Sequence, residues 1–341
     1  MIVRFGFVAM SLLLENASPS KTMTFTAFSK LDDREAAIRK LERIAEENLK
    51  NTLRILKHSK AHDIAMYRFS SKLIPLATHE ALQDWDPYKA TALSGAFREV
   101  GHYATQSGIR TSFHPDHFCV FSTPRPEVLK NSIKDLEHHV RMLELMELDE
   151  RSKNNIHMGG AYGNKEAAGE RFVEQFGALP DRCRHRVTLE NDDKTFNVIE
   201  TLAAAETVSV PMVLDIHHHA VNPGELEEDE LLADVWPRIA GTWRKERERL
   251  GLTESELPPK IHASSPKSAT DPRGHADNVE PEPLLRFLQR AARETGHLDC
   301  MLEAKNKDAA LLQLMEDFKQ LEAKGEGVKI LNGASVEISP I

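Results

Sequence analysis

Residues 211–218, Pro-Met-Val-Leu-Asp-Ile-His-His, form an apolar stretch that ends in an acid and two histidines. Short apolar or β-branched stretches of this kind recur about eight times along the chain, separated by amphipathic segments. In one such segment Ile38, Leu41 and Ala45 recur at spacings of three and four, which is typical of a helix. Alternating strands and helices predict a parallel sheet, and about eight repeats predict a closed (β/α)8 TIM barrel.

The chain shows no internal division. The predicted strands are Ile2–Val8, Asp63–Ser70, Arg110–His114, Asn155–Gly159, Arg186–Asn191, Pro211–His218, Lys260–Ser264 and Leu298–Lys305. The predicted helices include Arg34–Lys57, Tyr88–Thr105, Glu127–Leu148, Lys165–Phe176, Lys194–Ala205 and Pro283–Glu294. Asn222–Pro258 has the composition of a solvated helix and loop, and Thr270–Pro281 that of a loop. We expect one α/β domain over residues 1–341, with residues 325–341 left open as a peripheral tail.

Composition limits the class of protein. The 341 residues are 40% hydrophobic and 28% charged, and no apolar stretch approaches the ~20 residues of a membrane-spanning helix. Three cysteines without paired spacing indicate a reducing compartment, the cytoplasm. The net charge of −9 is unusual for a protein that binds nucleic acid. Bound divalent cations would change the local charge, so this total does not exclude such a partner.

Polar residues follow most of the later predicted strands. Because the carboxyl ends of barrel strands meet at one rim, we expect these side chains to converge. Imidazoles and carboxylates together suit Mn, Zn or Fe, and their number suggests two or three ions. Taken singly, each is more often a hydrogen-bonded structural residue; the set as a whole predicts a metal site. The residues are His79, His114, His157, Glu190, Asp215, His218, His262, His275 and Glu303.

Two lysines belong to the same predicted rim. Lys260 lies two residues before His262, so both face the same side of a strand, and burial there would lower its pKa. It would be a charge partner or a carbamylated ligand, or a structural lysine paired with a nearby carboxylate. Lys305 follows Glu303 and would reach phosphate, or it is a solvated loop residue.

Several stretches in order resemble the UV damage endonuclease family over nearly the whole chain. They are Arg4–Val8, Lys21–Phe25, Tyr67–Ser71, Leu73–Pro75, Ser112–Pro115, His157–Gly163, Leu189–Asp193, Lys260–His262 and Glu303–Lys305. The resemblance implies a barrel with up to three divalent ions, with Mn²⁺ favoured over Zn²⁺ or Mg²⁺. It implies an ATP-independent nick immediately 5′ of cyclobutane dimers and 6-4 products in double-stranded DNA, and activity on abasic sites. We expect the enzyme to act as a monomer.

The resemblance also assigns roles to residues. By position, the nine acids and histidines above match the metal ligands of the family, and Lys260 matches a lysine that can be carboxylated. Glu190 and Glu303 would bridge metals and orient the attacking water. The family inserts Gln followed by an aromatic residue into the duplex; here the loop has His117 and Phe118. Further DNA contacts are predicted at Phe7, Tyr162, Lys165, Ser265, Lys267 and Lys305.

Three other functions fit parts of the pattern. A metal-dependent sugar isomerase on the same barrel also uses metals, His and Glu, but the extra His ligands and His117-Phe118 on a predicted loop favour DNA. A non-catalytic binder of damaged DNA would keep a degenerate site, whereas the ligand types here are intact. A metal-dependent amidohydrolase is weakened because the first strand carries no His-x-His.

Overall fold

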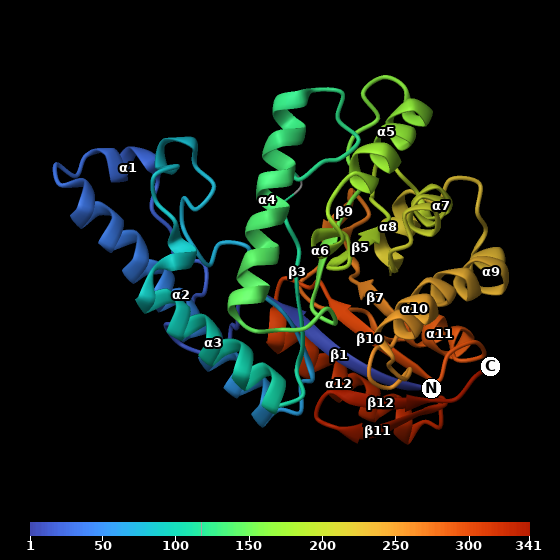
Figure 1. Ribbon diagram of the computed structural model, residues 1–341. Coiled ribbons are helices and arrows are strands. Elements are labelled where there is room, and N and C mark those ends of the chain that lie inside the picture. The colour runs from blue at the N-terminus through green and yellow to red at the C-terminus, as the bar shows by residue number, and fades with distance from the viewer. Residues whose placement is uncertain (117) are drawn as a thin grey trace.

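Eight parallel strands close into a barrel (Figure 1). The computed structural model describes residues 1–116 and 118–341. The barrel strands are β1 (Ile2–Val8), β2 (Met66–Arg68), β3 (Arg110–Phe113), β4 (Lys153–Ile156), β5 (Val187–Glu190), β6 (Met212–Asp215), β7 (Lys260–Ala263) and β10 (His297–Leu302). Neighbouring strands pair in chain order, and β10 pairs with β1 to close the ring. The barrel predicted from the strand–helix repeats is confirmed.

Helices connect the strands and cover the barrel. They are α1 (Phe25–Ser29), α2 (Arg34–Ala61), α3 (Thr91–Gln106), α4 (Pro126–Leu145), α5 (Lys165–Gly177), α6 (Asp181–Arg184), α7 (Val198–Val208), α8 (Ile216–Val221), α9 (Glu228–Glu230), α10 (Trp236–Leu250), α11 (Pro281–Ala291) and α12 (Lys307–Ala323). Two short 3₁₀ helices, η1 (Glu80–Leu82) and η2 (Pro87–Lys89), and a short π-helix, η3 (Leu231–Val235), are also described. The helix predicted from Lys194 begins later because Asn197 and Glu200 form a capping box.

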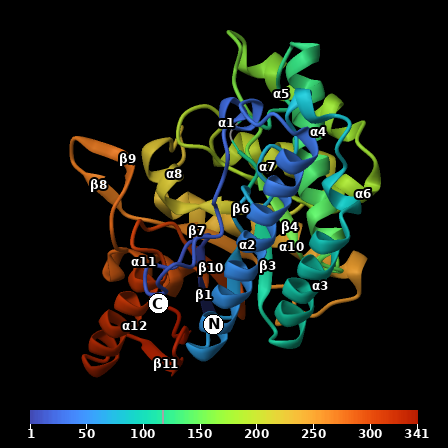
Figure 2. The ribbon, with the colours of Figure 1, turned by 90° about the vertical axis from the view of Figure 1, so that its left-hand side faces the viewer.

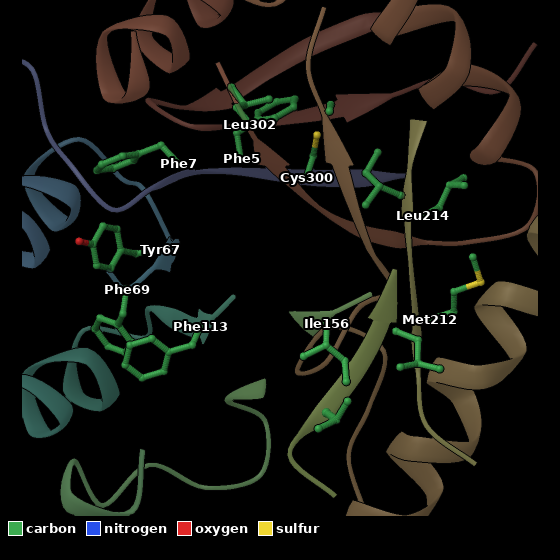
Figure 3. Packing of buried hydrophobic residues seen from close by; sticks show 14 of the residues in the cluster. Phe5, Phe7, Tyr67, Phe69, Phe113, Ile156, Met212, Leu214, Cys300 and Leu302 are labelled. Carbon is green, nitrogen blue, oxygen red and sulfur yellow. The ribbon is translucent and has the colours of Figure 1, made fainter. Parts of the chain in front are cut away.

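The outward faces of the strands carry the apolar core. Alternate residues of a strand point to opposite faces, so Phe5 and Phe7 of β1 share one face. Phe5 packs against Phe318 of α12 with ring centroids 5.6 Å apart. Figure 3 shows Phe7, Tyr67, Phe69 and Phe113 in succession across β1, β2 and β3, and adjacent rings lie 5.1–5.5 Å apart.

The inward faces are unusually polar for a barrel, whose interior is commonly layered with Val, Ile and Leu. Arg4 Nε lies 2.7 Å and Arg110 Nη1 2.6 Å from the two oxygens of Asp299, which is wholly buried. The Arg110 guanidinium also lies 4.9 Å from the ring of Trp243 in α10. Both Trp236 and Trp243 are wholly buried, so the segment 222–258, predicted as solvated, contributes to the core.

Two hairpins extend the barrel. Strands β8 (Pro266–Ser268) and β9 (Asp271–His275) form an antiparallel pair where the sequence predicted a loop, and Figure 2 shows it projecting beside α8. Strands β11 (Val328–Asn332) and β12 (Ser335–Ile338) form the second hairpin from residues 325–341. There β12 pairs antiparallel with the first half of β1, and Val336 and Ile338 are buried.

Among the described residues, no helix is both long enough and apolar enough to cross a membrane. The long helices instead alternate buried and exposed positions, as α2 does with Leu41, Ala45 and Leu49 buried along one side. Their apolar sides therefore face the barrel.

The Asp299 ion-pair cluster gives a stability prediction. Burial alone would raise the pKa of Asp299, but Arg4 and Arg110 hold it below its usual value. Asp299→Asn should therefore lower the free energy of unfolding by about 3 kcal/mol at neutral pH, because two guanidinium groups lose their partner. Urea-induced unfolding measures this change.

The same experiment has a pH arm. A carboxyl group whose pKa is lowered by folding stabilises the protein above its unfolded pKa of about 4, and this contribution is lost as the pH falls through the folded value. The gap between wild type and Asp299→Asn should therefore shrink in acid. The control is Asp271→Asn, in the exposed pair with Lys267, for which we expect little change. If the difference in stability between wild type and Asp299→Asn did not depend on pH, the lowered pKa of Asp299 would be contradicted.

Candidate active site

Acids and histidines gather where the barrel strands end. His114 follows β3, Glu190 ends β5, Asp215 ends β6, and Glu303 follows β10. Because parallel strands of a closed barrel all point the same way, these ends form one rim. We call the set of side chains at this rim the bowl; it comprises His114, His157, Glu190, Asp215, His218, His262, His275 and Glu303.

Glu190 lies at the centre of the bowl and is 1% exposed. Its Oε2 lies 3.1 Å from His114 Nε2, and its Oε1 lies 3.1 Å from His262 Nδ1. The Asn155 amide also donates to Oε2. Burial acts to raise the pKa of Glu190, but His262 and His157 together with the hydrogen bonds bring it well below its usual value. Glu190 is therefore an anion at neutral pH.

Glu303 faces Glu190 across His262. Its Oε1 accepts from Arg68 Nη1 and lies 3.1 Å from His262 Nδ1. Burial acts to raise the pKa of Glu303, while Arg68 and then His262 lower it, and the net pKa is well below the usual value. One imidazole edge thus lies between two buried carboxylates.

Asp215 is the third buried acid. Its Oδ1 caps α8 by accepting from the backbone N–H groups of His217 and His218, each at 2.8 Å. Its Oδ2 is buried without a hydrogen-bond partner in the described part of the chain. Burial raises the pKa of Asp215 to about 7, against the opposing effect of His218, and Glu190 and Glu303 add to the rise. Such a site favours a positively charged partner at Oδ2.

Four histidines share one orientation. In each, Nδ1 lies within hydrogen-bond distance of a backbone carbonyl, which only accepts, so Nδ1 carries a proton and donates it. This hydrogen bond fixes the orientation of the ring, the arrangement typical of histidines that bind metals. The pairs are His114 with Pro115 at 2.9 Å, His157 with Glu190 at 3.2 Å, His218 with Asn191 at 3.0 Å and His275 with Glu303 at 2.7 Å.

Two sets of ligand atoms are close enough to hold an ion. Within each set all the atoms lie within 4.8 Å of one another, and Glu190 belongs to both. His218 adjoins them, with Nδ1 3.5 Å from Glu190 Oε1, and its ring lies 6.4 Å from that of His275. The first set is His114, His157 and Glu190; the second is Glu190, Asp215, His262 and Glu303.

His79 does not belong to either set. It caps η1, where its Nδ1 accepts from the Ala81 N–H at 3.2 Å. Its ring stacks on Phe25 of α1 with centroids 4.1 Å apart. The structure therefore gives His79 a packing role and does not place it with the other predicted ligands.

Lys260 lies in the barrel beneath the bowl and is 4% exposed. Its Nζ donates to Ser112 Oγ at 3.1 Å. Burial, with Arg110 and Arg68 nearby, lowers the pKa of Lys260 to about 7. The prediction that Lys260 faces the same side as His262 and is desolvated agrees with this position.

Some of the residues predicted to contact DNA are exposed to solvent. Phe118 is 74% exposed on the segment after β3, and Tyr162, Lys267 and Lys305 are also exposed. His117 lies outside the described residues. Phe118 therefore offers a large aromatic surface to a ligand.

Two predicted DNA contacts are corrected by their surroundings, and a third, Lys165, forms an exposed ion pair within the chain. Phe7 is wholly buried against Tyr67, so its ring is not available to stack on a base. Ser265 is 6% exposed, and its Oγ accepts from the Glu280 N–H at 2.8 Å. Lys165 is paired with Glu200 at 2.7 Å at the start of α5. All three contribute to local structure.

Sequence reasoning missed the partners of the carboxylates. Arg68 at the end of β2 holds Glu303, and Asn155 in β4 holds Glu190. Asn155 lies two residues before His157, and Arg68 is paired in register with Ser112, two residues before His114, so both face inward. Arg68 lies within a stretch that resembles the family and ends a strand. These two features could have identified it as a residue of the barrel rim.

A model of the family described as UV-endonuclease UvdE matches residues 3–336. The chain belongs to this family. The UV DNA damage endonuclease of Halalkalibacterium halodurans is 40% identical over 341 residues, all of both chains. That of Bacillus pumilus is 41% identical over 340 residues, 99% of both chains. Membership confirms the resemblance and the enzyme class predicted from the sequence, an endonuclease of UV-damage repair.

Solved structures agree with this family. The crystal structure of SacUVDE superimposes with a TM-score of 0.75 at 27% identity, over 94% of this chain and 99% of the other. Endonuclease IV from Thermus thermophilus gives a TM-score of 0.52 at 13% identity, over 94% and 99% of the two chains. The second likeness concerns the fold alone.

The Arg68–Glu303 pair gives an activity prediction. Arg68→Met should reduce nicking of UV-irradiated plasmid by about tenfold or more, because residues that orient a functional carboxylate commonly contribute that much. Arg68→Lys should restore little, since a single ammonium does not reproduce the guanidinium geometry. Arg39→Met, in the exposed pair with Glu35 on α2, is the control. Unchanged nicking by a folded Arg68→Met variant would rule out this role.

Proposed function

We propose that the enzyme hydrolyses the phosphodiester bond immediately 5′ of cyclobutane dimers and 6-4 products in double-stranded DNA, without ATP. It leaves a 3′-hydroxyl and a 5′-phosphate, and it also cuts at abasic sites. The observation that supports this most is the bowl, in which Glu190 is shared by two candidate ligand sets at the rim of the barrel. Family membership supports damaged DNA as the substrate.

The residues of the bowl fit divalent ions. Three buried acids concentrate negative charge, and Asp215 Oδ2 and His262 Nε2 are buried without partners in the described part of the chain. Mixed imidazole and carboxylate ligands suit Mn²⁺, with Zn²⁺ or Mg²⁺ as alternatives. Up to three ions would be held by His114, His157, Glu190, Asp215, His218, His262, His275 and Glu303. Such ions activate water and neutralise phosphate oxygens.

The chain's own residues orient this chemistry. Arg68, Asn155 and the backbone carbonyls fix the ligand side chains before substrate arrives, which lowers the cost of reorganisation. Glu190 and Glu303, both anionic, orient the attacking water. Lys260 lies beneath them as a charge partner or, if carboxylated, as a further ligand.

Recognition depends on the shape of the damaged duplex. A photoproduct weakens stacking and pairing, so extruding it costs less than extruding normal bases. Phe118, with His117 beside it in the sequence, stacks in the gap that remains. Tyr162, Lys267 and Lys305 contact phosphates, which position the protein on the duplex. The enzyme acts as a monomer with a single domain.

The proposed function predicts that nicking depends on metal ions. Dialysis against EDTA should abolish nicking of UV-irradiated plasmid, and Mn²⁺ added alone should restore it. Glu190→Gln should reduce both nicking and the metal bound per protein, measured by plasma mass spectrometry, because both ligand sets lose a charge. Glu166→Gln, exposed on α5, is the control. Near-normal nicking by Glu190→Gln, or full activity of metal-free protein, contradicts the proposal.

The proposed function also predicts that Phe118 takes part in recognising the lesion. Phe118→Ala should weaken binding to a duplex with one cyclobutane dimer by about tenfold, since stacking on an aromatic ring contributes roughly 1–3 kcal/mol per base. Binding to the undamaged duplex should change little. Leu331→Ala, an exposed apolar residue on β11, is the control. Equal losses on both duplexes would show that Phe118 does not discriminate damage.

A further inference from the structure

The segment between β3 and α4 changes from exposed to buried within one residue. Phe118 is 74% exposed, whereas Cys119, the next residue, is 3% exposed and Phe121 is wholly buried. The Phe121 ring packs against Phe176 of α5 with ring centroids 5.7 Å apart. The exposed aromatic ring of Phe118 therefore lies directly before a stretch of chain that is fixed in the core.

One side chain of α4, which runs beside this segment in Figure 1, contacts its backbone. Ser132, in the second turn of α4, is wholly buried, and its hydroxyl oxygen accepts from the Val120 N–H at 2.9 Å. The same oxygen lies 3.0 Å from Val120 O, 3.4 Å from Phe118 O and 2.8 Å from Val128 O, so its single proton is donated to one of these carbonyl oxygens. The Cys119 thiol donates to Ser132 O at 3.5 Å. Ser132 thus contacts every residue from Phe118 to Val120.

A buried serine in the middle of a helix ordinarily bonds to its own helix. Ser59 of α2 is such a residue: it is wholly buried, and its hydroxyl donates to Ile55 O, four residues earlier, at 2.9 Å. Ser132 has the equivalent neighbour in Val128 O, but its hydroxyl also contacts two residues outside α4. These additional contacts indicate that Ser132 holds the segment before α4 as well as the helix.

A second anchor of the same segment follows at Ser122. The Ser122 hydroxyl donates to Gly160 O at 2.9 Å, and the Ser122 N–H donates to Met158 O at 3.2 Å. A Cβ atom at Gly159 would lie 2.6 Å from Ser122 Oγ, so the two backbones are in close contact. These contacts join the segment to the turn that follows His157 of the bowl. The chain after Phe118 is therefore held by α4 on one side and by the barrel rim on the other.

We propose that Ser132 is a positioning residue for lesion recognition, because it fixes the backbone of residues 118–120 so that the Phe118 ring is oriented before DNA binds. This inference rests on the stacking role of Phe118 in the proposed function. A side chain that is held in place before binding loses less conformational entropy on binding. Since Ser132 is wholly buried, it acts through Phe118 and does not touch the substrate.

The first experiment measures how well the enzyme discriminates damaged from undamaged DNA. Ser132→Ala should weaken binding to a duplex with one cyclobutane dimer by about fivefold, the effect of one lost hydrogen bond, and should leave binding to the undamaged duplex nearly unchanged. In nicking assays with Mn²⁺ the KM should rise by a similar factor, while kcat at saturating DNA stays close to that of wild type. In a Phe118→Ala background Ser132→Ala should add nothing, because the ring that it positions is gone. Ser59→Ala is the control, matched in burial and in its place within a helix.

The second experiment needs no DNA. The protein is labelled with 4-fluorophenylalanine, and the ¹⁹F signal that is missing from Phe118→Ala belongs to Phe118. In Ser132→Ala this signal should sharpen and move toward that of the free amino acid, because the ring becomes more mobile. Ser59→Ala should leave it unchanged. Circular dichroism and urea-induced unfolding verify that both serine variants are folded.

The outcomes separate this inference from the proposed function. A loss of discrimination in Ser132→Ala together with a changed ¹⁹F signal supports the positioning role. If Phe118→Ala lowers discrimination and Ser132→Ala does not, the inference is overturned while the stacking role of Phe118 stands. It is also overturned if Ser132→Ala weakens binding equally to both duplexes, weakens it by the same factor in the Phe118→Ala background, or leaves the ¹⁹F signal unchanged. If neither variant alters discrimination, the stacking role and the inference both fail.

Discussion

Three acidic side chains, Glu190, Asp215 and Glu303, lie within a few ångströms of one another at the rim of the barrel. Neighbouring side chains keep two of them, Glu190 and Glu303, charged. A buried carboxylate is unstable unless it is paired. Glu190 is paired with His114, His262 and Asn155, and Glu303 with Arg68. Asp215 Oδ1 accepts from the start of α8, while Oδ2 has no hydrogen-bond partner among the described residues, and burial raises the pKa of this carboxyl group. The buried acids and histidines of the bowl could therefore hold a cation.

The two faces of the barrel strands have different roles: the outer face packs against helices, and the inner face carries charged residues. Aromatic and aliphatic side chains on the outer face pack against helices, as Phe5 does against Phe318. The inner face carries charge from bottom to top, from the Asp299 cluster through Lys260 to Glu190. Because the helices stabilise the strands from outside, the interior need not be apolar. This arrangement holds Glu190, Asp215 and His262 on rigid strands, which preserves their geometry.

The sequence predicted the barrel and most of the bowl because both depend on local pattern: strand periodicity, and the residue that ends each strand. Glu190, Asp215 and Glu303 could be found in this way. It could not show that Phe7 faces the helices, because the parity of β1 depends on which neighbour it packs against. His79 sits in an irregular segment whose path is set by contact with Phe25. Arg68 and Asn155 were missed because their role comes from partners 235 and 35 residues away.

The pairing of β12 with β1 bears on how the chain reaches this fold. Val3 lies opposite Leu298 on one edge and Val336 on the other. The first half of β1 pairs with β10 on one edge and with β12 on the other. During synthesis neither edge can form these hydrogen bonds until almost the entire chain has been made. Contacts this distant in sequence slow folding and leave an exposed strand edge meanwhile. The first half of β1 therefore completes its pairing only when both β10 and the β11–β12 hairpin are in place.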